Sequence, residues 1–265
     1  MLIVLSPAKS LDFDSPLPPT AVELAGDLTS PAYVAQSEVL VRQARELAID
    51  GLAQLMEISP ALATLNAQRF QVWTADADSP SARPAFWAFD GDVYDGLQAR
   101  TLSAGALRWA QQHVRILSGL YGLLRPLDRM QPYRLEMGRA LPTPAGRGLY
   151  RFWGDDLAEG LNQLGAANRA PLVVNLASQE YFKAVKRPAL KLPVVDVVFE
   201  EVRAGQAKVI SFFAKRARGL MARYVIEHRL DHPDALRSFD LEGYAWSRQQ
   251  STAARWVFQR ENRGP

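Results

Sequence analysis

A short run of aliphatic residues, Leu172–Leu176 (LVVNL), most strongly constrains how this chain can fold. A run of this length between polar residues is typical of a buried strand. It leads directly into a segment where Ser178 can cap a helix that carries Lys183 and Lys186. Leu2–Leu5 is a second run of the same kind. Buried strands followed by helices indicate an α/β fold.

Other patterns along the chain predict further elements around these two strands. With no internal repeat and no linker, we expect a single compact domain over residues 1–265, in which helices surround a mixed sheet. Strands are predicted at Ala85–Phe89, at Val194–Arg203 and Gln206–Ala214 (a hairpin joined through Ala204-Gly205), and at Tyr244–Trp246 and Arg255–Gln259. Helices are predicted at Pro31–Ile49, at Gly51–Met56, from Ser59 onward, and at Ser103–His113, Asp155–Leu164, Lys215–Leu230 and Pro233–Phe239.

Composition excludes several classes of site. The chain has no cysteine, which rules out disulfides, thiolate catalysis, Fe–S clusters and cysteine-bound zinc. The N-terminal MLIVLSPAKS has no basic region before its apolar run, so we expect no signal peptide. No apolar run approaches the ~20 residues that a membrane-spanning helix needs, and we expect no membrane partner.

Positive charge is concentrated in two stretches. The formal net charge is only +3. Residues 203–229 nevertheless hold seven Lys and Arg residues against Glu227 alone, and residues 108–139 hold six arginines against Asp128 and Glu136. Such asymmetry indicates an anionic partner, with a solvated basic face as the alternative.

The stretch Val114–Gly138 joins an apolar run, two glycines and several arginines. Two interpretations of it remain open. In one, Val114–Ser118 is a buried strand followed by a tight turn. In the other, Leu117–Gly122 is the hairpin of a helix-hairpin-helix-like element, in which Gly119 and Gly122 let backbone N–H groups approach a DNA phosphate.

Two predicted helix starts add candidate anion-binding groups. Free N–H groups and the helix dipole favour an anion at the start that Ser178 caps. A second helix is expected to begin at Lys215, and basic residues in its first turns oppose the dipole unless an anion lies there. The basic residues concerned are Lys183 and Lys186 in the first helix, and Lys215, Arg216, Arg218 and Arg223 in the second.

No pattern predicts a metal site or a cofactor. The carboxylates of Asp90–Gly96 do not match the calcium loop and are better explained as a turn. His228 and His232 are four residues apart, but Pro233 follows and no acidic third ligand is evident. Nucleotide-binding loops of the GxGxxG or Walker A type are also missing.

Several strings, in their order and spacing, resemble one family. They are LSPAKSLDF (Leu5–Phe13), GDVYDGL (Gly91–Leu97), LSGLYGLLRPLD (Leu117–Asp128), QPYRLEMG (Gln131–Gly138), FWG (Phe152–Gly154), NLAS and EYF (Asn175–Ser178, Glu180–Phe182) and KRARGLMARY (Lys215–Tyr224). Together they resemble the YaaA family of bacterial peroxide-stress-response proteins over almost the whole chain.

The resemblance implies a cytoplasmic DNA-binding protein that limits iron-mediated damage under hydrogen peroxide stress. It implies an unusual single-domain α/β fold with a positively charged cleft and a helix-hairpin-helix element. On this sequence, the cleft would be lined by Lys9, Arg125, Arg134, Lys183, Lys186, Lys215, Arg216, Arg218 and Arg223, and the hairpin would contain Gly119 and Gly122.

Three functional hypotheses follow. The first is binding of double-stranded or structured DNA through its phosphates, with weak sequence preference and no protein partner inferred. The second is an enzyme acting on a phosphate- or carboxylate-bearing small molecule or nucleotide in the same cleft, with the candidate residues Lys9, Arg134, Asn175, Ser178, Glu180, Tyr181 and Lys183. The third, direct iron sequestration, is disfavoured because the chain has no cysteine and no His/carboxylate cluster.

Overall fold

An eight-stranded mixed sheet forms the centre of the computed structural model, which describes residues 1–261. Its strands are β1 (Leu2–Leu5), β5 (Val114–Ser118), β6 (Gly122–Leu124), β10 (Val173–Asn175), β11 (Val194–Arg203), β12 (Gln206–Lys208), β13 (Ala245–Trp246) and β14 (Arg255–Glu261). The order across the sheet is β13-β14-β11-β10-β1-β5-β6, and β12 pairs with β11 beside this path. The five strands from β14 to β5 are parallel, while β6, β12 and β13 are antiparallel to their neighbours. The prediction of a mixed α/β fold is therefore confirmed.

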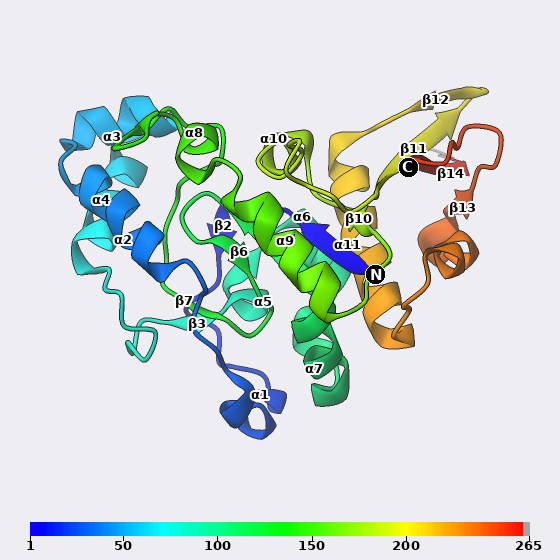
Figure 1. The fold of residues 1–265 in the computed structure, drawn as a ribbon, viewed down its shortest axis with the longest axis horizontal. Coiled ribbons are helices and arrows are strands. Elements are labelled where there is room, and N and C mark those ends of the chain that lie inside the picture. The colour runs from blue at the N-terminus through cyan, green and yellow to red at the C-terminus, as the bar shows by residue number, and fades with distance from the viewer. Residues whose placement is uncertain (262–265) are drawn as a thin grey trace.

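Helices and small sheets surround this centre (Figure 1). The helices are α1 (Thr20–Glu23), α2 (Val34–Arg45), α3 (Ile49–Met56), α4 (Pro60–Val72), α5 (Ala85–Ala88), α6 (Asp92–Leu97), α7 (Ala104–His113), α8 (Leu149–Trp153), α9 (Asp156–Ala167), α10 (Gln179–Phe182) and α11 (Ser211–His228). Short 3-10 helices span Ala25–Asp27, Ala99–Thr101, Pro233–Ser238 and Leu241–Gly243. Two-stranded sheets pair β2 (Ser10–Leu11) with β4 (Phe89–Asp90), β3 (Arg83–Pro84) with β7 (Arg129–Met130), and β8 (Pro142–Thr143) with β9 (Gly146–Arg147).

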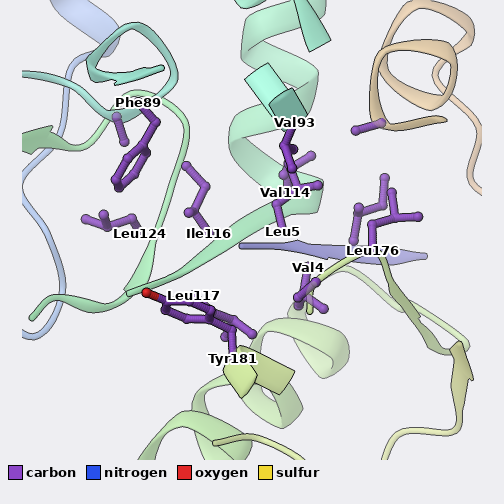
Figure 2. Packing of buried hydrophobic residues seen from close by; sticks show 14 of the residues in the cluster. Val4, Leu5, Phe89, Val93, Val114, Ile116, Leu117, Leu124, Leu176 and Tyr181 are labelled. Carbon is purple, nitrogen blue, oxygen red and sulfur yellow. The ribbon is translucent and has the colours of Figure 1, made fainter. Parts of the chain in front are cut away.

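The middle of the sheet is covered on both faces. Every residue of β1 and β5 is buried, as expected for parallel strands between two helical layers. Figure 2 shows Val93 of α6 on one side of these strands and Tyr181 of α10 on the other. In Figure 1, α9 crosses in front of the sheet, while α2, α3 and α4 gather at the end of the molecule farthest from β13 and β14. None of the described helices is long and apolar enough to cross a membrane.

The strand order reverses beside β1. The chain runs from β1 to β5 on one side, and then returns to β10 on the other side before it continues to β11 and β14. In open parallel sheets, such a reversal leaves a crevice at the carboxyl ends of the two adjacent strands, where ligands commonly bind. Here, Ser6 and Ser178 lie at that point. The Ser178 N–H donates to Ser6 Oγ over 2.8 Å, and Ser6 Oγ donates to Ser178 Oγ over 3.3 Å.

The predicted cap at Ser178 is confirmed, and Ser59 and Ser103 cap the helices that were predicted to begin there. The hydroxyls of Ser59, Ser103 and Ser178 accept backbone N–H bonds at the starts of α4, α7 and α10. These signals are local, because an N-cap serine needs only the N–H groups two or three residues further along the chain.

Two predicted strands are wrong. Ala85–Phe89 is mostly the helix α5, because a fully apolar run carries no periodicity that separates a strand from a buried helix. Gln206–Ala214 ends as a strand at Lys208, and α11 begins at Ser211, earlier than the predicted Lys215. Strand β12 is exposed on both faces, whereas Ala214 and later residues of α11 are buried at helical spacing, so burial favours the helix.

Helices α6 and α11 cross at a very short distance. A Cβ at Gly96 would overlap the Arg216 carbonyl oxygen, and a Cβ at Gly219 would overlap the Val93 carbonyl oxygen. Each helix therefore needs a glycine where it meets the backbone of the other. This crossing orients the basic face of α11, which carries Lys215 and Arg218, toward the carboxyl ends of the parallel strands.

The imidazole of His113 titrates in a half-buried site. It stacks on Trp109, and its Nδ1 lies 3.2 Å from the Met1 carbonyl oxygen. Burial lowers the pKa of His113, and the nearby N-terminal ammonium and Arg115 act in the same direction, while the Met1 carbonyl and Asp231 oppose them.

A lowered histidine pKa means that the unfolded chain binds more protons than the native protein below pH 6.5. The free energy of unfolding should therefore rise with pH through that window. We expect the difference in this free energy between pH 5.5 and pH 7.5 to be smaller in His113→Gln than in wild type, as measured by urea unfolding. Equal pH dependence in the two proteins would contradict a lowered pKa.

Candidate anion-binding site

A cavity of about 420 Å³ lies at the strand-order reversal. We call it the serine cavity. It is formed by the exit loop of β1, the start of α6, the start of α10 and the basic face of α11. Its polar lining residues are Ser6, Lys9, Ser10, Asp90, Asp92, Ser178, Glu180, Tyr181, Lys215 and Arg218.

The charges of the serine cavity balance. Three basic and three acidic side chains line it. Lys215 Nζ lies 3.3 Å from an Asp92 carboxylate oxygen, and Glu180 Oε1 accepts the Gly138 N–H over 3.0 Å. Burial raises the pKa of Tyr181, so its phenol stays protonated and can donate a hydrogen bond. The charged side chains of the serine cavity thus nearly cancel.

A second hollow of about 410 Å³, the lysine recess, lies against the ends of β10 and β11. Its polar lining residues are Asn175, Gln179, Lys183, Lys186, Asp196, Arg218 and Arg255. The Asp196 carboxylate accepts a hydrogen bond from the Asn175 side-chain amide over 2.7 Å, and Arg255 lies 3.1 Å from Glu200. Four basic side chains against one carboxylate make this recess positive.

Arg218 lines both hollows. Its Nε is buried without a hydrogen-bond partner in residues 1–261, and no carboxylate there lies within ion-pair distance of its guanidinium. Burial lowers the pKa of Arg218, although the group remains charged at neutral pH. A partly buried cation without a protein partner is costly to maintain, so this side chain is the strongest sign of a ligand.

A buried carboxylate holds two of the predicted site residues. Glu136 is 3% exposed, and its Oε1 lies 3.0 Å from an Arg134 nitrogen and 3.5 Å from Lys9 Nζ. Arg139 approaches its other oxygen at 3.5 Å. A very small hollow beside the serine cavity brings Lys9, Arg134 and Tyr181 together. Arg134 is therefore near the cleft but already paired.

The tertiary structure gathers part of the predicted set. Lys9, Lys183, Lys186, Lys215 and Arg218 line the two hollows, as do the proposed enzyme residues Asn175, Ser178, Glu180 and Tyr181. Ser6, Asp196 and Arg255 were not predicted. Ser6 could have been inferred from its position at the end of a buried strand, whereas nothing local indicates that Arg255 lines the same hollow as Lys183.

Three predicted arginines are occupied elsewhere. Arg125 lies 3.0 Å from Asp128, Arg216 lies 2.7 Å from Glu242, and Arg223 lies 2.6 Å from Glu227. None of the three lines either hollow. Their charges are used to join segments of the fold.

The hairpin interpretation of Leu117–Gly122 is wrong in its secondary structure. The segment joins strands β5 and β6, which pair antiparallel, and no helix flanks it directly. Both glycines are buried: a Cβ at Gly119 would overlap the Leu135 carbonyl oxygen, and Gly122 has φ +67° against Trp153 and Leu157. Their glycine identity is explained by packing, and the alternative prediction of a strand and tight turn is confirmed.

The helix-start argument is also corrected. Because α11 begins at Ser211, Lys215 lies in its second turn and does not oppose the free N–H groups. Helix α10 has only four residues, so its dipole is small, although Ser178 caps it as expected. The lysines instead line the two hollows.

The described part of the chain holds no cluster of three His, Asp or Glu side chains arranged to bind a metal ion. The prediction that Asp90–Gly96 is a turn is wrong: Asp92–Leu97 forms the helix α6 after Gly91, and the Asp92 carboxylate pairs with Lys215.

Comparison with known proteins identifies the family. A family model described as "Peroxide stress protein YaaA" matches residues 1–250. A UPF0246 protein of Paracidovorax citrulli is 56% identical over 264 residues, which covers 100% of both chains. UPF0246 proteins of Ralstonia nicotianae and Bordetella pertussis are 54% and 53% identical over 261 residues, covering 98% of this chain and 99% of theirs. The chain therefore belongs to the YaaA family of peroxide stress proteins.

Proposed function

We propose that this peroxide stress protein binds DNA through its phosphate groups at the lysine recess and the adjoining edge of the sheet. The observation that carries the proposal is the set of cations without carboxylate partners. Lys183, Lys186 and Arg218 enter no ion pair with another residue of the described chain, in contrast to Arg125, Arg216 and Arg223. Cations of this kind release bound counterions when they meet a phosphate backbone.

The contacts proposed here are with phosphates. The basic side chains at the recess are lysines and arginines, which suit contacts with phosphate groups. Binding of this type has weak sequence preference. In a cell under hydrogen peroxide, it would act to protect DNA from iron-mediated damage.

Salt titration tests this proposal directly. Each phosphate contact adds about 0.9 to the slope of log K against log salt. Replacing both Lys183 and Lys186 by methionine should therefore reduce the slope for duplex DNA by about 2. Affinity near 0.1 M salt should fall by about tenfold or more. Fluorescence anisotropy with a labelled duplex at several salt concentrations gives both quantities.

The matched control also removes two positive charges, but at the amino ends of the parallel strands. Arg169 and Lys191 precede β10 and β11, and both are exposed. Arg169→Met/Lys191→Met should bind DNA as wild type does. Equal losses in the two double variants would mean that only net charge matters, and salt-independent affinity would refute phosphate contact.

A second candidate is an enzyme or binding protein for a phosphate- or carboxylate-bearing small molecule. The size of the two hollows favours it, since each falls within the range of ~300–1,000 Å³ typical of small-molecule pockets. Saturable binding of a small phosphate that Arg218→Met abolishes, with duplex affinity unchanged, would favour this candidate over DNA binding.

A further inference from the structure

We propose that the serine cavity and the lysine recess form one bipartite site for a phosphate monoester whose other part is rich in hydrogen-bond donors. Nucleoside monophosphates are one such class of compound. The inference rests on the second candidate function and does not require that the protein bind DNA. It assigns a different chemical part of the ligand to each hollow.

The phosphate is assigned to the lysine recess. A phosphate monoester is close to doubly charged at neutral pH and has three strong acceptor oxygens. Lys183 and Lys186 provide ammonium groups, and Lys183 Nζ lies 4.9 Å from the Tyr150 ring centroid. Arg218 provides a guanidinium whose Nε has no partner in the described part of the chain. A phosphate here would supply the missing acceptor.

The donor-rich part is assigned to the serine cavity. A second anion is disfavoured there, because Asp90, Asp92 and Glu180 balance the basic side chains. Asp92 is engaged by Lys215, but Asp90 forms no ion pair with the rest of the described chain. Its carboxylate and that of Glu180 can accept bonds from hydroxyl or amino groups of a ligand.

Ser178 connects the two hollows. Its hydroxyl oxygen accepts from Ser6 Oγ and from the Tyr181 N–H, and within residues 1–261 its own proton has no acceptor. It lines the serine cavity, while the neighbouring Ala177 and Gln179 line the lysine recess. A ligand that passes Arg218 from one hollow to the other would meet this free donor.

Calorimetric titration of the purified full-length protein tests the inference. The probes are adenosine 5′-monophosphate, adenosine, and inorganic phosphate, with the other three common ribonucleoside monophosphates as a panel. At least one monophosphate should bind at least tenfold more tightly than both its nucleoside and inorganic phosphate. A panel without saturable binding below 1 mM, or binding no tighter than that of phosphate, would overturn the proposal.

Three variants locate the two parts. Arg218→Met should weaken binding of the best monophosphate by tenfold or more, and Arg218→Lys should restore part of it. Asp90→Asn should weaken monophosphate binding while leaving inorganic phosphate unchanged. Arg216→Met removes the same charge two residues from Arg218, outside both hollows, and should bind as wild type.

Thermal unfolding separates a ligand site from a structural role. Because Arg218 has no hydrogen-bond or ion-pair partner among residues 1–261, Arg218→Met should unfold at the same temperature as wild type or higher, whereas a structural arginine would show a lower midpoint. A lower midpoint with unchanged monophosphate affinity would overturn the proposal. Duplex binding without monophosphate binding would also overturn it and leave the DNA-binding proposal standing. Monophosphate binding without duplex binding would refute the DNA-binding proposal and leave the bipartite site standing.

Discussion

Gly219→Ala is expected to lower the free energy of unfolding by about 3 kcal/mol. The added methyl group would overlap the Val93 carbonyl oxygen and crowd the Leu97 backbone nitrogen, which lies 2.7 Å from the position of the new Cβ. These are backbone atoms of α6, so no side chain can rotate away. The two helices must separate, which also exposes buried surface around Leu220 and Val93.

The same substitution should weaken ligand binding in whatever protein remains folded. Lys215 and Arg218 belong to α11, and Asp92 belongs to α6, so a shift between the helices changes the shape of the serine cavity. Urea unfolding followed by circular dichroism measures stability, and calorimetric titration with the best monophosphate measures binding.

Gly51→Ala is the matched control for this prediction. Gly51 also lies within a helix, α3, and a Cβ there would meet only Leu47 side-chain atoms at 3.6 Å or more. We expect it to be neutral or to stabilise by up to about 1 kcal/mol, because alanine restricts the unfolded chain. Similar destabilisation by both substitutions would show that the helix crossing is not the cause.

Asp128→Ala is expected to destabilise the protein by about 3–5 kcal/mol. Asp128 is 0% exposed. Its Oδ1 accepts from the Thr29 hydroxyl and from Arg125 Nε at 3.0 Å, and its Oδ2 accepts from the Arg125 backbone N–H at 2.8 Å. Removing the carboxylate leaves these donors unsatisfied and the Arg125 charge uncompensated.

Asp234→Ala provides the comparison for Asp128. Asp234 pairs with Arg237 at 3.0 Å, but its side chain is 57% exposed, and exposed pairs contribute about 1 kcal/mol or less. Urea unfolding should separate the two variants clearly. If Asp128→Ala lowered the free energy of unfolding as little as Asp234→Ala does, Arg125 would be free to bind a ligand, as the sequence suggested.

Local signals predicted much of the fold. The apolar runs of β1 and β10 and the three serine caps depend on neighbouring residues, and all were found where expected. The short apolar run at Ala85–Ala88 lacked such a signal, because a fully buried segment has no polar face to show its period.

The partners of the arginines could not be predicted in the same way. Arg125 is neutralised three residues away, but Arg216 meets Glu242, 26 residues further along. Sequence proximity made all of them candidates for one cleft. Only the packing of distant segments decides which cations keep a carboxylate and which remain available to a ligand.

The sequence by itself determined the α/β class, the buried strands β1 and β10 and the concentration of basic residues, because hydrophobic pattern and composition are properties of the chain alone. Tertiary structure decided why the glycines are required and which residues belong to the site. Gly119 and Gly219 are required by backbone atoms at Leu135 and Val93, and Arg218 is distinguished by the partner that it lacks. Those contacts arise only when segments far apart in the chain pack together.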